Sequence, residues 1–332
     1  MLIATDLDGT LVPNASSSLS PYTAQVLKQV DDAGIPVVFV TGRPLRWMEP
    51  FWPHIGEHGL AVVSNGAITY DVHEREVVTT TGIEPALGLE IAAAISAEVP
   101  GSTFAIERPD GIRQGPDFIE RYRVPEGSRR GPLAEIWDVP AVKLLVRHET
   151  LDHDEFRDRV TAAVGDLAHA TWSVPGLVEI SAAGVTKASA LVGLCARLGV
   201  EASDVVAFGD MPNDIPMLAW AGTSYAVANA HESVLAISDH VAPPCDEEGV
   251  ARVMDGLLAR VGRAGGSPLY VKLGDTESPR GGGRREREQH EREDVSRRRG
   301  SRTRRVGAID RPGEHGGRRA SAGLDRKPAG SG

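Results

Sequence analysis

Short runs of apolar residues alternate with amphipathic stretches in the first third of the chain. Leu2–Thr5, Ile35–Val40 and Leu60–Ser64 lack polar alternation, which is typical of strands that are buried on both faces. Between the first two runs the pattern predicts a helix over 21–33, which a Ser-Pro pair opens and Gly34 closes. Strand, helix and strand in this order indicate a parallel sheet with helices on its faces.

The middle of the chain has a different order of elements, in which helical patterns are separated by pairs of strand-like runs. The expected elements are helix 84–98, strand 103–108, a loop rich in Pro, Gly and Arg, strand 141–147, helix 154–164 and strands near 170–174 and 177–181. This order predicts a separate, smaller α+β unit of about one hundred residues.

The alternating pattern resumes at Lys187. The expected elements are a helix to about Leu198, a strand at 204–208, another helix, a strand near 224–227 and a last helix to about Val261. We therefore predict one α/β domain with a doubly wound parallel sheet, built from residues 1–81 and 184–262. The middle unit, residues 82–183, is predicted to be inserted into it.

The last part of the chain, residues 263–332, differs in composition from the rest. It carries 18 Lys and Arg against 10 Asp and Glu, and only seven of its 70 residues are Leu, Ile, Val or Phe. Because so few apolar residues cannot build a core, we predict that this C-terminal tail is disordered. Two interpretations remain open: a tether for a nucleic acid or acidic partner, and a solvated tail with no specific role.

Charge and hydropathy restrict the partners of the remaining 262 residues. They carry 18 Lys and Arg against 36 Asp and Glu, and this acidic balance argues against nucleic acid as a partner of the body. No apolar run of 18 residues occurs, and a strand that begins at Leu2 leaves no room for a signal peptide. We therefore expect no membrane partner and a cytoplasmic protein. The two cysteines provide neither a disulfide framework nor a Cys-based metal site.

Four motifs fall at the ends of predicted strands or at the start of a helix, at the edge where open α/β sheets bind ligands. They are DLDGT at 6–10, TGR at 41–43, the Lys of GVTK at 187 and GDMPND at 209–214. Asp6 and Asp8 would repel each other and lose hydration at the end of a buried strand, so a partner must compensate them.

The chemistry of the four motifs matches phosphoryl transfer through a covalent aspartyl-phosphate. A carboxylate can attack phosphorus when its charge is screened, and Mg²⁺ prefers carboxylate, carbonyl and phosphoryl oxygens. A hydroxyl and a lysine can hold the remaining phosphoryl oxygens. A second carboxylate can protonate the leaving oxygen and later activate water.

In this order, the four motifs resemble those of the haloacid dehalogenase (HAD) superfamily of phosphatases, in the Cof-like branch with a large α/β cap. The SNGA at 64–67 and the size of the insert also match that branch. The resemblance covers residues 1–262 and excludes the tail. It implies a Rossmann-like core, a cap at 82–183 that sets specificity, and Mg²⁺-dependent hydrolysis of small phosphorylated metabolites, such as a sugar phosphate or a phosphorylated cofactor.

The resemblance also implies a role for each matching residue. Asp6 would be the nucleophile and Asp8 the general acid and base, while Thr41 would bind the phosphoryl group and Lys187 would neutralise it. Gly9 would let the chain turn sharply beside the phosphate. The expected catalytic set is Asp6, Asp8, Thr41 and Lys187. The expected phosphate-binding set is Thr41, Gly42, Arg43, Asn65, Lys187 and Asn213. The expected Mg²⁺ ligands are Asp6, the backbone carbonyl of Asp8, Asp210 and Asp214.

Three alternatives remain beside this interpretation. A phosphotransferase or sugar phosphomutase uses the same aspartyl-phosphate, but its cap must retain a bisphosphate through several arginines. The candidate cap arginines are Arg108, Arg121, Arg123, Arg129 and Arg130. A receiver-type signalling switch predicts one small domain without a cap and without an acid two residues after the nucleophile. A nucleic-acid tether with a passenger domain would place the function in the tail. Arg43 and Arg46 either anchor substrate or solvate a helix start that we expect after TGR.

Overall fold

The structure is a computed structural model that describes residues 1–264, with gaps at residues 15, 122–123 and 173, and side chains as far as residue 260. The prediction of a disordered tail at 263–332 falls, from residue 265 onward, on residues that the structure does not describe. Within the described part, no helix combines the length and the apolar character needed to cross a membrane.

The core is a parallel five-stranded sheet in the order β13-β12-β11-β1-β2. Its strands are β1 (Leu2–Thr5), β2 (Val37–Phe39), β11 (Val205–Gly209), β12 (Thr223–Val227) and β13 (His240–Ala242). The first strand lies in the middle of the order, with Thr5 opposite Phe39 on one side and Phe208 on the other. The two ends of the body therefore form one sheet, as the apolar runs predict.

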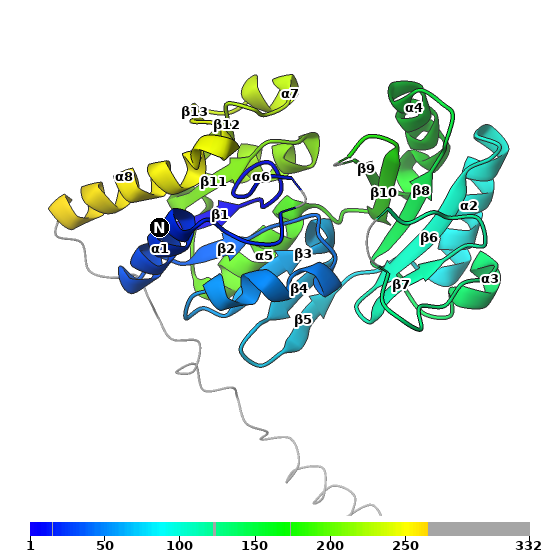
Figure 1. Ribbon diagram of the computed structural model, residues 1–332, viewed down its shortest axis with the longest axis horizontal. Helices are drawn as coiled ribbons and strands as arrows, with labels where there is room; N and C mark the ends of the chain where they lie inside the picture. The colour runs from blue at the N-terminus through cyan, green and yellow to red at the C-terminus, as the bar shows by residue number, and fades with distance from the viewer. Residues whose placement is uncertain (15, 122–123, 173, 265–332) are drawn as a thin grey trace, which may run out of the picture. The chain divides into compact units, whose positions relative to one another are not determined.

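Helices cover both faces of this sheet (Figure 1). They are α1 (Pro21–Asp32), α5 (Lys187–Leu198), α6 (Ile215–Trp220), α7 (Glu232–Leu235) and α8 (Gly249–Ala264). Ile3 packs with α1 and α8 on one face, whereas Ala4 packs with α5 and α6 on the other. Because successive side chains of a strand point to opposite faces, burial on both faces requires an unbroken apolar run. The predicted doubly wound α/β class is confirmed.

An antiparallel extension continues the core beyond β2. It contains β3 (Leu60–Val63), β4 (Ile68–Asp71) and β5 (Glu76–Thr80). A parallel bridge from Val40 to Val62 joins β3 to the end of β2. The expectation of a helix start after TGR is met only by two 3₁₀ helices, Leu45–Trp47 and Glu49–His54, because two prolines interrupt this segment.

An antiparallel cap sheet is inserted between β5 and α5, in the order β7-β6-β8-β10-β9. Its elements are α2 (Pro85–Glu98), β6 (Thr103–Arg108), β7 (Gly111–Gln114), α3 (Leu133–Ile136), β8 (Lys143–Arg147), α4 (His153–Val164), β9 (Ala168–Thr171) and β10 (Leu177–Ala182). Ile106, Leu144 and Ile180 pack against α2 and α4 on one face. The alternate residues of the same strands lie on the other face. The domain limits at 81/82 and 183/184 stay predictions.

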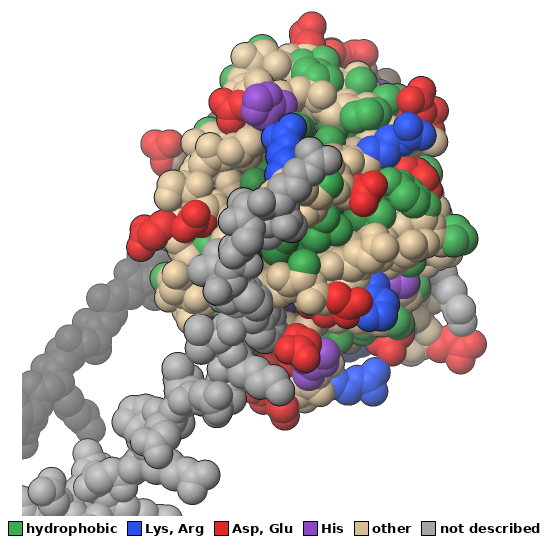
Figure 2. Space-filling view, turned by 90° about the vertical axis from the view of Figure 1, so that its left-hand side faces the viewer, with side chains coloured by type: hydrophobic (Ala, Val, Ile, Leu, Met, Phe, Trp, Pro, Cys, Tyr) green, Lys and Arg blue, Asp and Glu red, His purple; other side chains and the backbone are tan. Residues whose placement is uncertain are grey.

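Acidic and basic side chains are interspersed on the visible part of the face in Figure 2. Basic side chains stand singly there, with acidic ones close by. The visible part of this face therefore has no continuous basic patch, in keeping with the acidic composition of residues 1–262.

We predict that Phe208→Ala lowers the free energy of unfolding by about 3–5 kcal/mol. The Phe208 ring is fully buried and stacks on Tyr225, with 5.0 Å between ring centroids, so truncation leaves a cavity in the middle of the sheet. Urea denaturation measures the loss. The matched control is Val241→Ala on the edge strand β13, where the side chain is 59% exposed and the expected change is within about 0.5 kcal/mol. Equal losses in the two variants would contradict this placement of the core.

Candidate active site

The four sequence motifs meet at one edge of the core sheet. Asp6 directly follows β1, Thr41 lies two residues beyond β2, and Asp210 directly follows β11. Lys187 is the first residue of α5, whose cap is Thr186. Because parallel strands present their carboxyl ends at the same edge, residues far apart in the sequence come together here.

A buried lysine joins two of the aspartates. Lys187 Nζ lies 2.8 Å from Asp6 Oδ1 and 2.6 Å from Asp214 Oδ1, and the side chain of Lys187 is fully buried. Burial alone lowers the pKa of Lys187, but the charges of Asp214 and Asp6 raise it above its usual value. The lysine therefore stays protonated and supplies a fixed positive charge at the end of β1.

Three buried carboxylates form a group that could hold a metal ion. Oxygens of Asp6, Asp210 and Asp214 all lie within 4.8 Å of one another. Burial, with the neighbouring carboxylates, raises the pKa of Asp6 well above its usual range and that of Asp210 to about 7. One lysine leaves this group with excess negative charge. A hard divalent cation fits the all-oxygen donor set and would compensate that charge.

The turn after β1 is shaped to approach Asp210. Thr10 Oγ1 donates a hydrogen bond to Asp210 Oδ1 at 2.7 Å. Gly9 adopts a φ of +77°, and a Cβ at this position would lie 2.3 Å from Asp210 Oδ2. Only glycine fits both the backbone conformation and the space, which explains the glycine of DLDGT.

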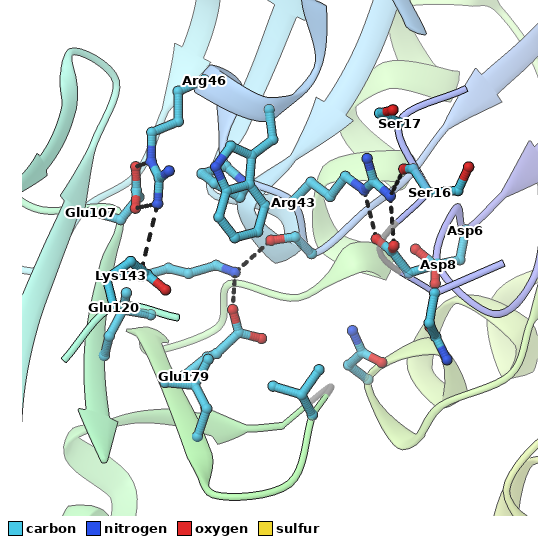
Figure 3. A pocket seen from close by; sticks show the side chains of 18 of the residues that line it. Asp6, Asp8, Ser16, Ser17, Arg43, Arg46, Glu107, Glu120, Lys143 and Glu179 are labelled. Atoms are coloured by element: carbon cyan, nitrogen blue, oxygen red, sulfur yellow. Dashed lines mark hydrogen bonds and ion pairs between the residues drawn. The ribbon is translucent and has the colours of Figure 1, made fainter. Parts of the chain in front are cut away.

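Asp8 does not join the buried carboxylate group but faces the pocket in an ion pair. Arg43 donates two hydrogen bonds to it, Nε to Oδ2 at 2.7 Å and Nη2 to Oδ1 at 2.6 Å (Figure 3). Arg43 is held in turn by the carbonyl of Ser16 at 2.7 Å and by the ring of Phe51 beneath it. The expected phosphate ligand Arg43 thus contacts the expected general acid and base.

The remaining expected phosphate ligands form a tight group around TGR. The Arg43 amide donates to Thr41 Oγ1 at 3.0 Å, and Asn213 Nδ2 donates to Asn65 Oδ1 at 3.1 Å. Asn65 has a φ of +58°, a left-handed conformation that asparagine tolerates. A Cβ at Gly42 would lie 2.9 Å from Asn65 Oδ1, so this glycine allows the two loops to touch.

A pocket of about 610 Å³ opens from Asp6 and Asp8 toward the polar face of the cap sheet. Figure 3 shows Asp6, Asp8 and Arg43 at one end and the cap residues at the other. Lys143 forms a buried ion pair with Glu179, and its Nζ donates to the carbonyl of Gly42 at 2.6 Å. Cap and core therefore touch through buried polar groups on the wall of the pocket.

A second ion pair crosses from core to cap beside the pocket. Arg46 donates to both oxygens of Glu107, at 2.9 and 3.2 Å, and lies 3.8 Å from Glu120. Burial raises the pKa of Glu107, while Arg46 acts to lower it. Of the two interpretations left open for Arg46, solvation of a helix start is wrong, since the side chain is largely buried in this pair.

Sequence reasoning missed the charged residues of the cap that line the pocket. They are Glu107, Glu120, Lys143, Arg147 and Glu179. The available signal was a pair of charged side chains four residues apart in an apolar strand, as in KLLVR at 143–147, which places both charges on the same face of the sheet.

The cap arginines that were considered instead lie elsewhere. Arg108 pairs with Asp110 and Asp138. Arg129 and Arg130 bond to other groups of the cap, and Arg121 is exposed. Arg123 lies outside the described residues.

Comparison with known proteins identifies the family. The model of the haloacid dehalogenase-like hydrolases matches residues 3–254. Similar proteins include a phosphoglycolate phosphatase of Methanopyrus kandleri, 29% identical over 78% of this chain and 98% of its own length. An HMP-PP phosphatase of Enterobacter sp. is 27% identical over 76% of this chain and 94% of its own length. A pyridoxal phosphate phosphatase of Escherichia coli is 28% identical over 71% of this chain and 90% of its own length.

Solved structures show the same fold. SMU.1108c from Streptococcus mutans is 25% identical, with a TM-score of 0.66 over 78% of this chain and 98% of its own. A haloacid dehalogenase-like hydrolase from B. subtilis has a TM-score of 0.65 over 77% and 99%, at 24% identity. The matched family covers both the core motifs and the inserted cap. The chain therefore belongs to the haloacid dehalogenase-like hydrolases, in the Cof-like branch of phosphatases that its motifs resemble.

Proposed function

We propose that this protein is a Mg²⁺-dependent phosphatase that hydrolyses small phosphorylated metabolites through a covalent aspartyl-phosphate on Asp6. The observation that carries the proposal is the placement of Asp6, which lines the pocket, is bound to Lys187 and is grouped with Asp210 and Asp214. A buried carboxylate whose charge is screened on one side by a lysine is a competent nucleophile toward phosphorus.

The proposed reaction has two steps. An Asp6 oxygen attacks phosphorus, the ester P–O bond breaks, and Asp8 gives a proton to the leaving oxygen. Asp8 then takes a proton from water, whose oxygen attacks the phosphorus of the aspartyl-phosphate and releases inorganic phosphate and free Asp6. Arg43 binds both oxygens of the Asp8 carboxylate, which lines the pocket. One of these two hydrogen bonds would have to open for Asp8 to carry the proton that it gives to the leaving oxygen.

The other site residues would bind and neutralise the phosphoryl group. Lys187 would offset the charge on Asp6 and on the phosphate, and the Thr41 hydroxyl would donate to a phosphoryl oxygen. Asp6, Asp210, Asp214 and the backbone carbonyl of Asp8 would hold Mg²⁺, which would supply Lewis-acid stabilisation of the phosphoryl charge.

The substrate is proposed to be a small phosphate ester such as a sugar phosphate or a phosphorylated cofactor. The similar proteins act, by their names, on phosphoglycolate, HMP-PP and pyridoxal phosphate, which are all small esters that differ in the leaving group. The pocket volume of about 610 Å³ suits molecules of this size. The alternative of a phosphomutase has less support, because Arg108, Arg129 and Arg130 bond to other parts of the cap.

A panel of small phosphate monoesters, assayed with Mg²⁺ and with EDTA, tests this function. We expect phosphate release in the presence of Mg²⁺ and none in the presence of EDTA. Asp6→Asn should lower kcat by about 10⁴-fold or more, since it removes the nucleophile. Asp204→Asn, which changes an exposed aspartate just before β11, is the matched control and keeps wild-type turnover. Full activity of Asp6→Asn would refute the mechanism.

Asp8→Asn is expected to lower kcat by about 10²–10⁴-fold, because it removes the group that moves protons in both steps. Rapid quench with a ³²P-labelled ester should then show a phospho-enzyme that decays more slowly than in the wild type. If the decay rates are equal, Asp8 does not activate water in the second step.

The pKa of Asp210 predicts a pH dependence of stability in metal-free protein. Between the ordinary value of 3.8 and about 7, folded Asp210 holds a proton that the unfolded chain has lost. Its contribution to the free energy of unfolding therefore falls as pH rises through this window. Urea denaturation in EDTA should show this decline in wild type relative to Asp210→Asn, which has no such proton.

Addition of Mg²⁺ to the same samples extends the test. Saturation at about 100 times the Kd should stabilise the wild type by about 2.7 kcal/mol and Asp210→Asn by much less. Identical pH profiles of the two proteins in EDTA would show that folded Asp210 does not hold this extra proton. An equal response to Mg²⁺ would show that Asp210 is not a ligand.

A further inference from the structure

A line of three hydrogen-bonded side chains connects the cap sheet to the expected phosphate site. Glu179 lies on β10 of the cap, Asn65 follows β3 of the core, and Asn213 belongs to the GDMPND motif. Asn65 Nδ2 donates to Glu179 Oε2 at 3.3 Å, and Asn213 Nδ2 donates to Asn65 Oδ1 at 3.1 Å. All three side chains are at least nine-tenths buried. The sequence motifs contain two of these residues but give no role to Glu179.

Glu179 determines the orientation of both amides, because a carboxylate only accepts hydrogen bonds. Asn65 must therefore turn its NH₂ group toward Glu179 and its carbonyl oxygen toward Asn213. Asn213 must then turn its own NH₂ group toward Asn65. A rotation of either amide by 180° would bring two donors or two acceptors together in a buried site, which is costly.

The far end of this line points to a ligand. Among the described residues, Asn213 Oδ1 has no hydrogen-bond partner, although this oxygen is buried. The Asn213 side chain is only 8% exposed and lines the pocket. A buried carbonyl oxygen without a partner lacks a donor, and a ligand or water bound beside Asn213 would supply it. The second hydrogen of Asn213 Nδ2 is also available to a phosphate oxygen.

Glu179 is itself held by Lys143, which contacts both cap and core. Lys143 forms a buried ion pair with Glu179 and donates to the carbonyl of Gly42 at 2.6 Å. Gly42 follows Thr41, the residue expected to bind the phosphoryl group. Cap and core thus touch at two neighbouring points, at Gly42 and at Asn65, and both points lie beside the expected phosphate site.

We propose that Glu179 is a positioning residue of the phosphate site: seated on the core, it orients Asn65 and, through it, Asn213 for phosphate binding. The proposal rests on the proposed function of this site. It assigns the cap a part in binding the phosphoryl group itself, in addition to the leaving group. A competing role for Glu179, direct contact with the leaving group, would affect only esters and not free phosphate.

Binding of inorganic phosphate to the full chain with Mg²⁺, measured by calorimetry, separates these roles. Glu179→Gln should raise the Kd for phosphate about tenfold. Glutamate accepts from Asn65 with one oxygen and from Lys143 with the other, whereas glutamine has only one oxygen that can accept. Asn65→Ala should weaken binding to a similar extent. In the Asn65→Ala background, Glu179→Gln should change the Kd by less than about twofold, because the residue through which it acts is gone.

The matched control is Glu149→Gln, which removes an exposed cap carboxylate just after β8 and should leave the Kd within about twofold. If Glu179→Gln fails to fold, Lys143→Met with Glu179→Leu replaces the buried pair by apolar side chains and allows the same comparison. An unchanged Kd in Glu179→Gln, equal effects of that change with and without Asn65, or no phosphate binding by the wild type would overturn the proposal.

The outcomes also distinguish this proposal from the proposed function. Phosphate binding that depends on Glu179, without hydrolysis of any ester, would leave the positioning role and refute the phosphatase. Hydrolysis by Glu179→Gln with wild-type phosphate affinity and a raised KM for some esters only would leave the phosphatase, and would assign Glu179 to the leaving group instead.

Discussion

The ammonium group of Lys187 lies fully buried between Asp6 and Asp214, and the whole site depends on this contact. Three carboxylates cannot be grouped in a buried place unless a positive charge accompanies them, since each one loses its hydration there. Lys187 is the first residue of α5, so the start of that helix has to reach the ends of β1 and β11. The helix, both strands and the turn at Gly9 are therefore constrained together.

In the cap, too, buried acidic side chains are accompanied by positive charges, but here they form ion pairs. Its polar face carries acidic and basic side chains that pair with each other and with Arg46 from the core. Such pairs gain little free energy when buried, because desolvation opposes their attraction, but they allow few alternative arrangements. The contacts at Gly42 and Asn65 thus define one way in which this face can meet the core.

Much of the core could be predicted from the sequence, because burial on both faces leaves an unbroken apolar run such as Leu2–Thr5 or Leu60–Val63. The motifs could be placed together because parallel strands end at one edge. The short strands β4, β5, β7 and β13 were missed, β7 within a stretch predicted as a loop. β5 is mostly exposed, so it shows no hydrophobic period. The charged residues of the cap were missed for another reason. Whether Glu179 is solvated or buried depends on pairing between strands, which local composition does not reveal.

The order of strands in the core sheet also bears on how the chain folds during synthesis. On one side β1 pairs with β2, which is synthesised soon after it. On the other side Leu2 pairs with Val205 of β11, which is synthesised some two hundred residues later. All five strands of the cap sheet lie between residues 103 and 182, and each of them pairs with another strand of that sheet. Contacts that are close in sequence form sooner than distant ones. The inserted sheet can therefore be complete while the parallel sheet that carries the site still lacks the strand on the other side of β1.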